Sequence, residues 1–305
     1  MTHEGNRQTS SWRGAAYGAA LAAVCAAAVA AQAPAAFDSS RAWEDLRQIV
    51  SFGPRPAGSA ALEQTRGYIE KQLADAGLKA EELPFDAKTP IGTIHMVNVR
   101  ATLPGPAGHG RLIVAGHYDT KLFHDFPFVG ADDGASSAAF VLELARALKG
   151  RKNALPIELL FLDGEEATGE WAGTDHTYGS RHYVEEARRK GTLEDIRAFI
   201  LVDMIGDRDL DIRRETNSTP WLTSAIWDAA HRLKQPAFLD DTTTVEDDHL
   251  EFLAAGVPSV DIIDLDYPAW HHPEDRLDRV AAGSLQAVGD VLIAALPAIE
   301  KHATR

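Results

Sequence analysis

Residues 157–166 read Ile-Glu-Leu-Leu-Phe-Leu-Asp-Gly-Glu-Glu. The first six residues form a short, mostly apolar run, which is typical of a strand buried inside a sheet. Two glutamates, Glu165 and Glu166, follow this run after a glycine. In open sheets of parallel strands, ligands bind beyond the carboxyl ends of the strands. The segment therefore predicts a buried strand and, at its end, a place where chemistry can occur.

Further strands and helices are predicted on both sides of this run. Strands are expected at residues 79–85, 95–102, 111–115, 157–162, 198–202 and 259–263, and helices at residues 39–52, 59–76, 135–148, 178–190, 221–233, 246–255 and 281–299. Strands that alternate with helices indicate a largely parallel sheet covered on both faces. No linker-like segment interrupts this pattern. We therefore expect an α/β fold in a single catalytic domain from residue 37 to residue 305.

The charge of the chain argues against a nucleic-acid partner. Its 305 residues carry a formal net charge of −15, whereas proteins that bind nucleic acid present a basic face to the phosphates. An acidic protein attracts cationic ligands instead, and the free amino terminus of a peptide is one of them.

The first 36 residues are predicted to be an export signal outside the folded domain. Arg7 and Arg13 precede an alanine-rich run at residues 14–31, which is the pattern of a secretory signal peptide. Cleavage is expected within residues 30–36, giving a periplasmic or secreted protein. The alternative is a retained membrane anchor, which the weak apolarity of alanine disfavours. The single cysteine, Cys25, lies in this run, so the mature chain is expected to contain no disulfide.

Acidic and imidazole side chains follow most of the predicted strands. They are His117, Asp119, Asp132, Asp133, Glu165, Glu166, Asp203, Glu246, Asp247, Asp248, His249, His271 and His272. Taken singly, each has a structural explanation, such as a helix N-cap, a turn or a solvated loop. Taken together, carboxylates gathered at one edge of a sheet are costly unless a cation or shared protons compensate them. Carboxylate oxygens combined with imidazole nitrogens suit Zn²⁺.

Eight segments carry a family resemblance. They are GHYDTK (116–121), FVGADDGAS (128–136), LELARAL (142–148), FLDGEEA (161–167), YGSRH (178–182), LVDMIG (201–206), EDDHLEFLAAGVP (246–258) and PAWHHPED (268–275). In these segments the chain resembles the animal-type glutaminyl cyclases, or glutaminyl-peptide cyclotransferases, which share their fold with the bacterial zinc aminopeptidases. DGEEA followed by Trp171 and YGSRH is typical of the cyclases. Glu246 is a departure, because the family usually has glutamine at this position.

The resemblance implies a zinc aminopeptidase-like fold, a three-layer αβα sandwich with a central mixed, largely parallel sheet. It implies one Zn²⁺ held by Asp133, Glu166 and His271, with the fourth tetrahedral position left for water or substrate. The aminopeptidases hold a second metal with the counterparts of His117 and Asp203. The donor atoms for two metals are therefore formally present, and the sequence leaves the metal count open.

Further site residues are also implied by the resemblance. Glu165 is expected to move protons during catalysis, and Asp203 and Asp247 to share protons with it. The aromatic walls of the substrate pocket are expected to include Trp171, Trp270 and Tyr267. For the tryptophans, the alternative interpretation is plain core packing.

The expected reaction is closure of an N-terminal glutamine into pyroglutamate with release of ammonia, on peptide or protein substrates. The alternative is a zinc aminopeptidase that hydrolyses N-terminal residues. A binding module that keeps the fold without activity is disfavoured, because no implied ligand is missing. A membrane contact is expected only if the N-terminal segment is not cleaved.

Overall fold

The computed structural model describes residues 1–5, 36–108 and 110–304. The chain divides into two units, Met1–Ala33 and Pro34–Arg305, and every helix and strand discussed below belongs to the second. Residues 6–35 of the predicted export signal, with Cys25 among them, lie outside the described residues. The expected signal and its cleavage therefore stay predictions.

A six-stranded mixed sheet forms the centre of the second unit. Its strand order is β1 (Glu81–Thr89), β2 (Gly92–Leu103), β4 (Ile157–Leu162), β3 (Arg111–His117), β5 (Ile196–Asp203) and β8 (Ser259–Ile263). The four strands β4, β3, β5 and β8 run parallel, while β1 and β2 are antiparallel additions at one edge. The predicted mixed, largely parallel sheet is confirmed.

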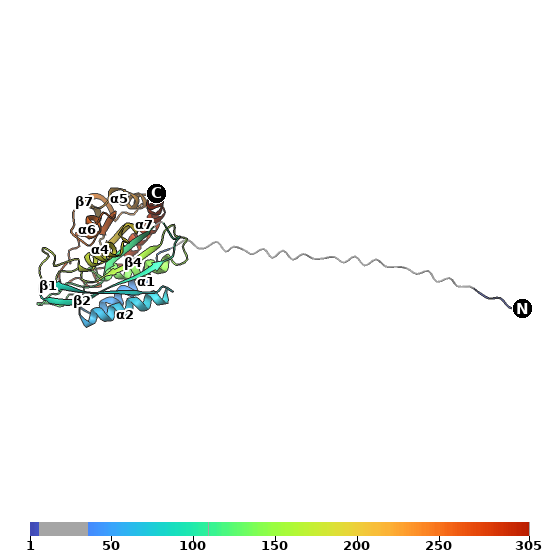
Figure 1. The fold of residues 1–305 in the computed structure, drawn as a ribbon, viewed down its shortest axis with the longest axis horizontal. Helices are drawn as coiled ribbons and strands as arrows, with labels where there is room; N and C mark the ends of the chain where they lie inside the picture. Colours follow the sequence, from blue (N-terminus) through green and yellow to red (C-terminus); the bar gives the residue numbers. More distant parts are fainter. Residues whose placement is uncertain (6–35, 109, 305) are drawn as a thin grey trace. The chain divides into compact units, whose positions relative to one another are not determined.

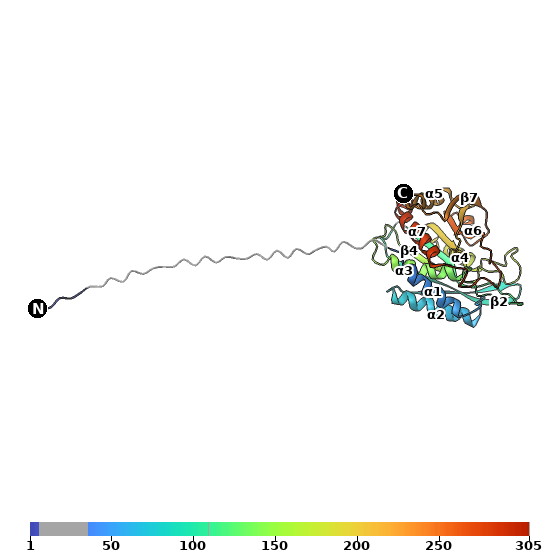
Figure 2. The same cartoon turned by 180° about the vertical axis from the view of Figure 1, so that it is seen from behind.

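Helices cover both faces of this sheet (Figures 1 and 2). One face carries α1 (Ser39–Ser51), α2 (Ala60–Asp75), α3 (Ala135–Ala147), α5 (Pro220–Leu233) and α7 (Ala282–Ala303), and the other carries α4 (Tyr178–Lys190) and α6 (His249–Ala254). Alternate residues of a strand point to opposite faces. On β3, Val114 packs with the first set of helices, whereas Ile113 and Ala115 pack with the second. The result is the expected three-layer sandwich.

Within the described part of the chain, α7 has the length and apolar composition of a membrane-spanning helix. Its apolar residues Leu285, Val288, Leu292 and Leu296 are nevertheless fully buried. The helix contacts α1, α3 and α5. It is therefore a core helix of the sandwich, and burial against its neighbours accounts for its composition.

The structure differs from the predicted elements in a few places. A small parallel sheet of β6 (Ile212–Glu215) and β7 (Phe238–Thr243) was not expected. A short 3₁₀ helix, Leu193–Asp195, was also missed. The helix predicted from residue 246 begins only at His249, because residues 246–248 form the loop and cap before it.

Candidate active site

The ends of three neighbouring parallel strands bring the first site residues together. His117 is the last residue of β3 and Asp203 is the last residue of β5. Glu165 and Glu166 follow β4 after a turn at Gly164, which has a φ of 69°. A Cβ atom on Gly164 would lie 2.5 Å from the Met96 sulfur, so both the backbone angle and the space favour glycine here. Because these strands are adjacent, the polar side chains meet at one edge of the sheet.

Three side chains from separate loops form what we call the open triad: Asp133, Glu166 and His271. The Nε2 atom of His271 lies 3.3 Å from Asp133 Oδ2 and 3.2 Å from Glu166 Oε1. One donor atom from each residue lies within 4.8 Å of the other two. The two carboxylates are buried, whereas the His271 side chain keeps 26% of its surface exposed and borders a cavity.

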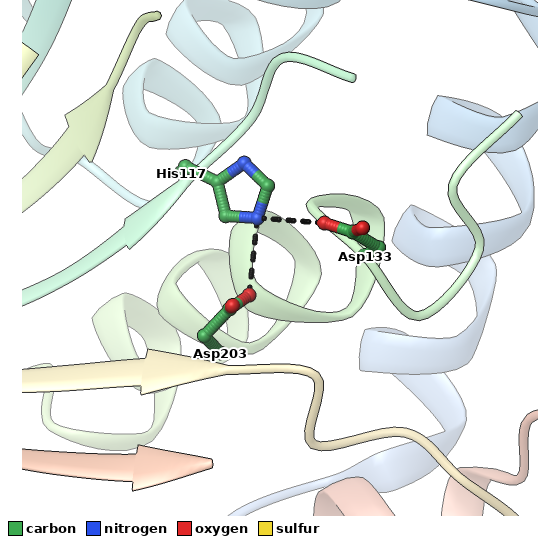
Figure 3. Close-up of side chains that lie close together, drawn as sticks. All are labelled: His117, Asp133 and Asp203. Atoms are coloured by element: carbon green, nitrogen blue, oxygen red, sulfur yellow. Dashed lines mark hydrogen bonds and ion pairs between the residues drawn. The ribbon is translucent and has the colours of Figure 1, made fainter. Parts of the chain in front are cut away.

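A second cluster, the buried triad, shares one of these residues. His117 Nε2 lies 3.0 Å from Asp203 Oδ1 and 3.2 Å from Asp133 Oδ1 (Figure 3). The side chains of all three residues are less than a tenth exposed. Asp203 and Asp133 together with Asp119 outweigh the effect of burial and raise the pKa of His117. The buried triad therefore favours a protonated imidazole.

The open triad has the properties of a cation site. Asp133 Oδ2 and Glu166 Oε2 are buried, and neither accepts a hydrogen bond within the described part of the chain. Burial, reinforced by Asp133, raises the pKa of Glu166 to about 7. Burial opposes the charged form of His271, but Asp133 and Glu166 outweigh it and raise the pKa of this imidazole to about 10. The cationic neighbours of these carboxylates are His271 Nε2, 3.3 Å from Asp133 Oδ2, and Lys121 Nζ, 3.9 Å from Glu166 Oε2. Two buried carboxylates and an imidazole with donor atoms this close together are a set that a divalent cation fits.

Glu165 lies beside the open triad and is 6% exposed. Burial raises its pKa well above the usual range, and the neighbouring Asp247 and Glu166 add to this against the opposing charge of His117. Burial also raises the pKa of Asp247, with contributions from Asp203 and Asp248. The carboxyl group of Glu165 therefore keeps its proton to a higher pH than an exposed glutamate does.

A cavity of about 550 Å³ opens in front of these groups. Its lining includes Asp133, Glu165, Glu166, Asp203, Asp247, His271, Trp171 and Trp270. The Trp270 ring stacks on His271 with centroids 4.5 Å apart and is 43% exposed. Trp171 stacks on His176 at 4.3 Å, and its indole nitrogen donates to Glu246 at 3.3 Å. The two tryptophans form apolar walls beside a floor of acidic groups.

The sequence of the chain matches a known family over most of its length. Residues 98–296 match the sequence model of Peptidase family M28. The "Glutaminyl-peptide cyclotransferase-like protein" of Mus musculus is 37% identical over 273 residues, which is 78% of this chain and 70% of the mouse protein. The chain belongs to the glutaminyl-peptide cyclotransferases of peptidase family M28.

Solved structures of cyclotransferases and of a peptidase share this fold. The Acidobacteriales bacterium glutaminyl cyclase has a TM-score of 0.84 and 37% identity, covering 90% of this chain and 98% of that one. A leucine aminopeptidase precursor from Bacteroides thetaiotaomicron has a TM-score of 0.78 and 26% identity, covering 86% and 97%. The fold is thus common to both kinds of protein, and the higher identity lies with the cyclase.

Of the site residues expected from the resemblance to the cyclotransferases, one lies elsewhere. Tyr267 is 4% exposed and its hydroxyl donates to Asp275 Oδ1 at 2.8 Å. It borders a separate cavity of about 500 Å³ that Asp207 and Asp264 also line. Leu265, two residues earlier in the same loop, lines the tryptophan-walled cavity instead. Hydrogen bonding of the phenol to a buried carboxylate holds the ring away from the tryptophan-walled cavity.

Several residues that support this cyclotransferase site were given no role from the sequence. Asp119 accepts hydrogen bonds from the backbone of Glu165 at 3.2 Å and of Glu166 at 3.3 Å, so it orients both glutamates. Arg55 is fully buried, and its guanidinium donates to the carbonyls of residues 118, 129 and 130. Asp275 accepts the backbone N–H groups of Asp132 and Asp133. An arginine between two prolines, at residues 54–56, was the one available signal.

Proposed function

We propose that this chain is an exported, zinc-dependent glutaminyl-peptide cyclotransferase. Its substrate is a peptide or protein with an N-terminal glutamine, and its products are the pyroglutamyl peptide and ammonia. The observation that carries the proposal is the position of Glu165, whose carboxyl group lies beside the open triad and lines a cavity walled by Trp171 and Trp270. Membership of the cyclotransferase family supports the same assignment.

The open triad would hold one zinc ion. Two carboxylate oxygens and one imidazole nitrogen are a known zinc ligand set, and they leave one tetrahedral position open toward the cavity. Bound there, zinc supplies a Lewis acid for the γ-carbonyl oxygen of the substrate glutamine. The buried oxygens of Asp133 and Glu166 that accept no hydrogen bond within the described residues support this assignment.

Glu165 acts as the general base and then as the general acid. The α-amino nitrogen attacks the γ-carbonyl carbon, a C–N bond closes the five-membered ring, and the bond to the amide nitrogen breaks. In its ionised form the Glu165 carboxylate takes the proton lost by the attacking amine. In its protonated form it gives that proton to the departing ammonia. A carboxyl pKa raised toward neutrality suits both steps, and burial among Asp247 and Glu166 raises the pKa of Glu165.

Trp171 and Trp270 hold the glutamine side chain folded toward its own amine. The reaction is intramolecular, so the main task of the protein is to keep the two reacting atoms within attack distance. Flat apolar walls limit the rotamers of a bound side chain and exclude water from it. Both tryptophans line the cavity, whereas Tyr267 does not.

One assay separates this function from its alternative. A glutamine-initiated peptide and leucine amide are offered to the purified mature chain, and ammonia and free leucine are measured. We expect ammonia and no leucine. Release of leucine without ammonia would establish an aminopeptidase instead. The buried triad favours testing this alternative, because His117, Asp133 and Asp203 have donor atoms close enough for a second metal.

Metal analysis and mass spectrometry test the remaining parts. We expect about one zinc per chain in protein purified without chelator. We expect the protein recovered from the exporting cell to begin within residues 30–36. A full-length chain in the membrane fraction would show a retained anchor.

A further inference from the structure

Two residues of the open triad, Asp133 and His271, lie on loops that are far apart in the sequence. Asp133 precedes α3, and His271 lies in the loop after β8, far away in the sequence. His271 has a φ of 57°, a left-handed backbone conformation that is unfavourable for a residue with a side chain. Such strain persists only where surrounding contacts hold it in place. Contacts between these two loops must therefore fix the distance between Asp133 and His271.

Asp275 joins the two loops. It follows His271 by four residues in the same loop and is 1% exposed. Its carboxylate accepts the backbone N–H of Asp132 at 2.8 Å and that of Asp133 at 3.1 Å. Its own carbonyl accepts the N–H of Ala131 at 3.4 Å. Three successive amides of one ligand-bearing loop therefore point at a single residue of the other.

Two buried side chains support this arrangement. Tyr267 donates its hydroxyl to Asp275 Oδ1 at 2.8 Å. Arg55 donates to the carbonyls of residues 129 and 130, immediately before the amides that Asp275 accepts. Burial lowers the pKa of Arg55 to about 10, and Asp275 is the carboxylate that counteracts this most. The loop at residues 129–133 is thus held through its carbonyls by a cation and through its amides by an anion.

We propose that Asp275 is a positioning residue that fixes the separation of Asp133 and His271, with Tyr267 holding its carboxylate in place. Asp275 touches neither the cavity nor the donor atoms of the open triad. It acts through the backbone of Asp133, so its loss widens the range of positions that this ligand adopts. The proposal rests on the proposed zinc site and is independent of the reaction catalysed there.

The test measures zinc affinity of the purified full-length mature chain by competition with a chromogenic chelator. Asp275→Asn leaves a side chain of the same shape but places an amide N–H against a backbone N–H. We expect the zinc dissociation constant to rise about 10–100-fold, as is found for residues that orient metal ligands. Tyr267→Phe removes only the supporting hydroxyl, and we expect a smaller rise of about threefold in the same assay.

Asp264→Asn is the matched control. Asp264 is also 1% exposed, and it accepts two backbone N–H groups, from Asp211 at 2.8 Å and from Asp266 at 3.1 Å. It lies seven residues before His271 in the same loop, but both amides that it accepts lie outside the loop that carries Asp133. We expect its zinc dissociation constant to stay within about twofold of the wild type, although its unfolding stability falls like that of Asp275→Asn.

The outcomes separate the two proposals. If the wild type binds no zinc, the proposed metal site is wrong. If the wild type binds zinc and Asp275→Asn binds it equally well, the positioning role is wrong. Equal weakening in both asparagine variants would also overturn it, because loss of stability alone would then explain the effect. Cobalt in place of zinc gives a second readout: the visible absorption bands shift in Asp275→Asn and Tyr267→Phe but not in Asp264→Asn. Unshifted bands in Tyr267→Phe would contradict the proposal even if Asp275→Asn fails to fold.

Discussion

The open and buried triads contain the same kinds of donor atom and share Asp133, yet they differ in their access to solvent. His117 in the buried triad is 1% exposed, and carboxylates from three directions raise its pKa. His271 in the open triad is 26% exposed and borders the cavity. The first cluster is closed off from solvent, with each of its three side chains less than a tenth exposed. The second has its imidazole at the cavity, where a cation can reach the buried carboxylates.

A third histidine, His249, also lies between two carboxylates and can be compared with His117 and His271. His249 is fully buried between Glu215, whose Oε2 lies 3.2 Å from Nε2, and Asp261, whose Oδ2 lies 3.6 Å from Nδ1. It is absent from the lining of the tryptophan-walled cavity, and no metal-binding group found in the described residues includes it. Donor types alone therefore do not make a metal site. Both carboxylate oxygens of Asp261 are also buried and accept no hydrogen bond within the described residues, so access to the cavity is what distinguishes the open triad.

The largest effect is expected from His271→Ala. The open triad then loses its only nitrogen donor, and we expect zinc content to fall to near zero and cyclisation to disappear. Loss of a ligand should cost more than the roughly 10–100-fold in affinity that loss of a supporting contact costs. The neighbouring exposed His272→Ala is the control and should keep its zinc. Full zinc occupancy in His271→Ala would show that the third ligand lies elsewhere.

Glu165→Gln should separate chemistry from metal binding. Removal of a general acid–base group lowers the rate by about 10²–10⁴-fold, while the open triad keeps all three donors and therefore its zinc. The rate of ammonia release and the metal content are measured on the same sample. Glu170→Gln, an exposed residue that lines the same cavity, is the matched control and should stay close to the wild-type rate. If zinc is lost from Glu165→Gln, the roles of Glu165 and Glu166 are reversed.

His117→Asn tests the buried triad directly. Breaking a buried ion pair by removing one partner typically costs about 3–5 kcal/mol, so we expect the free energy of unfolding to fall by about that amount. We expect zinc to remain at about one per chain, because the open triad is intact. Urea unfolding and metal analysis check the two expectations. A wild type with two zinc ions and a variant with one would show that the buried triad holds a metal.

The smallest effect concerns the pair of Glu215 and His249. The hydrogen bonds from His249, Asn217 and Ser218 outweigh burial and lower the pKa of Glu215 to about 2. An unfolded glutamate titrates near about 4.3. Stabilisation by this group is therefore complete above about pH 4.3 and is lost as the pH falls toward 2.

Urea unfolding at pH 6 and pH 3 measures this loss. We expect the wild type to lose about 1–2 kcal/mol more between these two pH values than Glu215→Gln does. Equal losses in the two proteins would show that Glu215 does not hold His249 through its charge.

Most of the fold was predictable because its signals are local. The continuous apolar run at β4 and the helix at Tyr178–Lys190 were predicted with the bounds that the structure has. β6 was missed because three of its four residues are charged. Its pairing with β7 depends on contacts between chain segments that are distant in the sequence. The pattern of apolar and polar residues in β6 does not predict these contacts.

The site was predictable in its donor atoms and less so in its supports. Asp133, Glu166 and His271 stand in segments shared with a family, so the resemblance pointed to them before any geometry was known. Arg55 and Asp275 form most of their contacts with backbone groups, and a backbone partner leaves no trace in the sequence. Tyr267 was expected beside the substrate, but its hydroxyl binds Asp275.

Asp133 presents its two oxygens to two different imidazoles, Oδ1 to His117 and Oδ2 to His271. Both oxygens belong to one planar group, so they turn together about the bond that carries them. A rotation of the carboxylate about that bond therefore changes the contact with His117 and the contact with His271 at the same time. Changes at His117 and His271 should consequently be non-additive in a double-mutant cycle. Through Asp133, the buried imidazole of His117 is thus coupled to the imidazole of His271 at the ligand cavity.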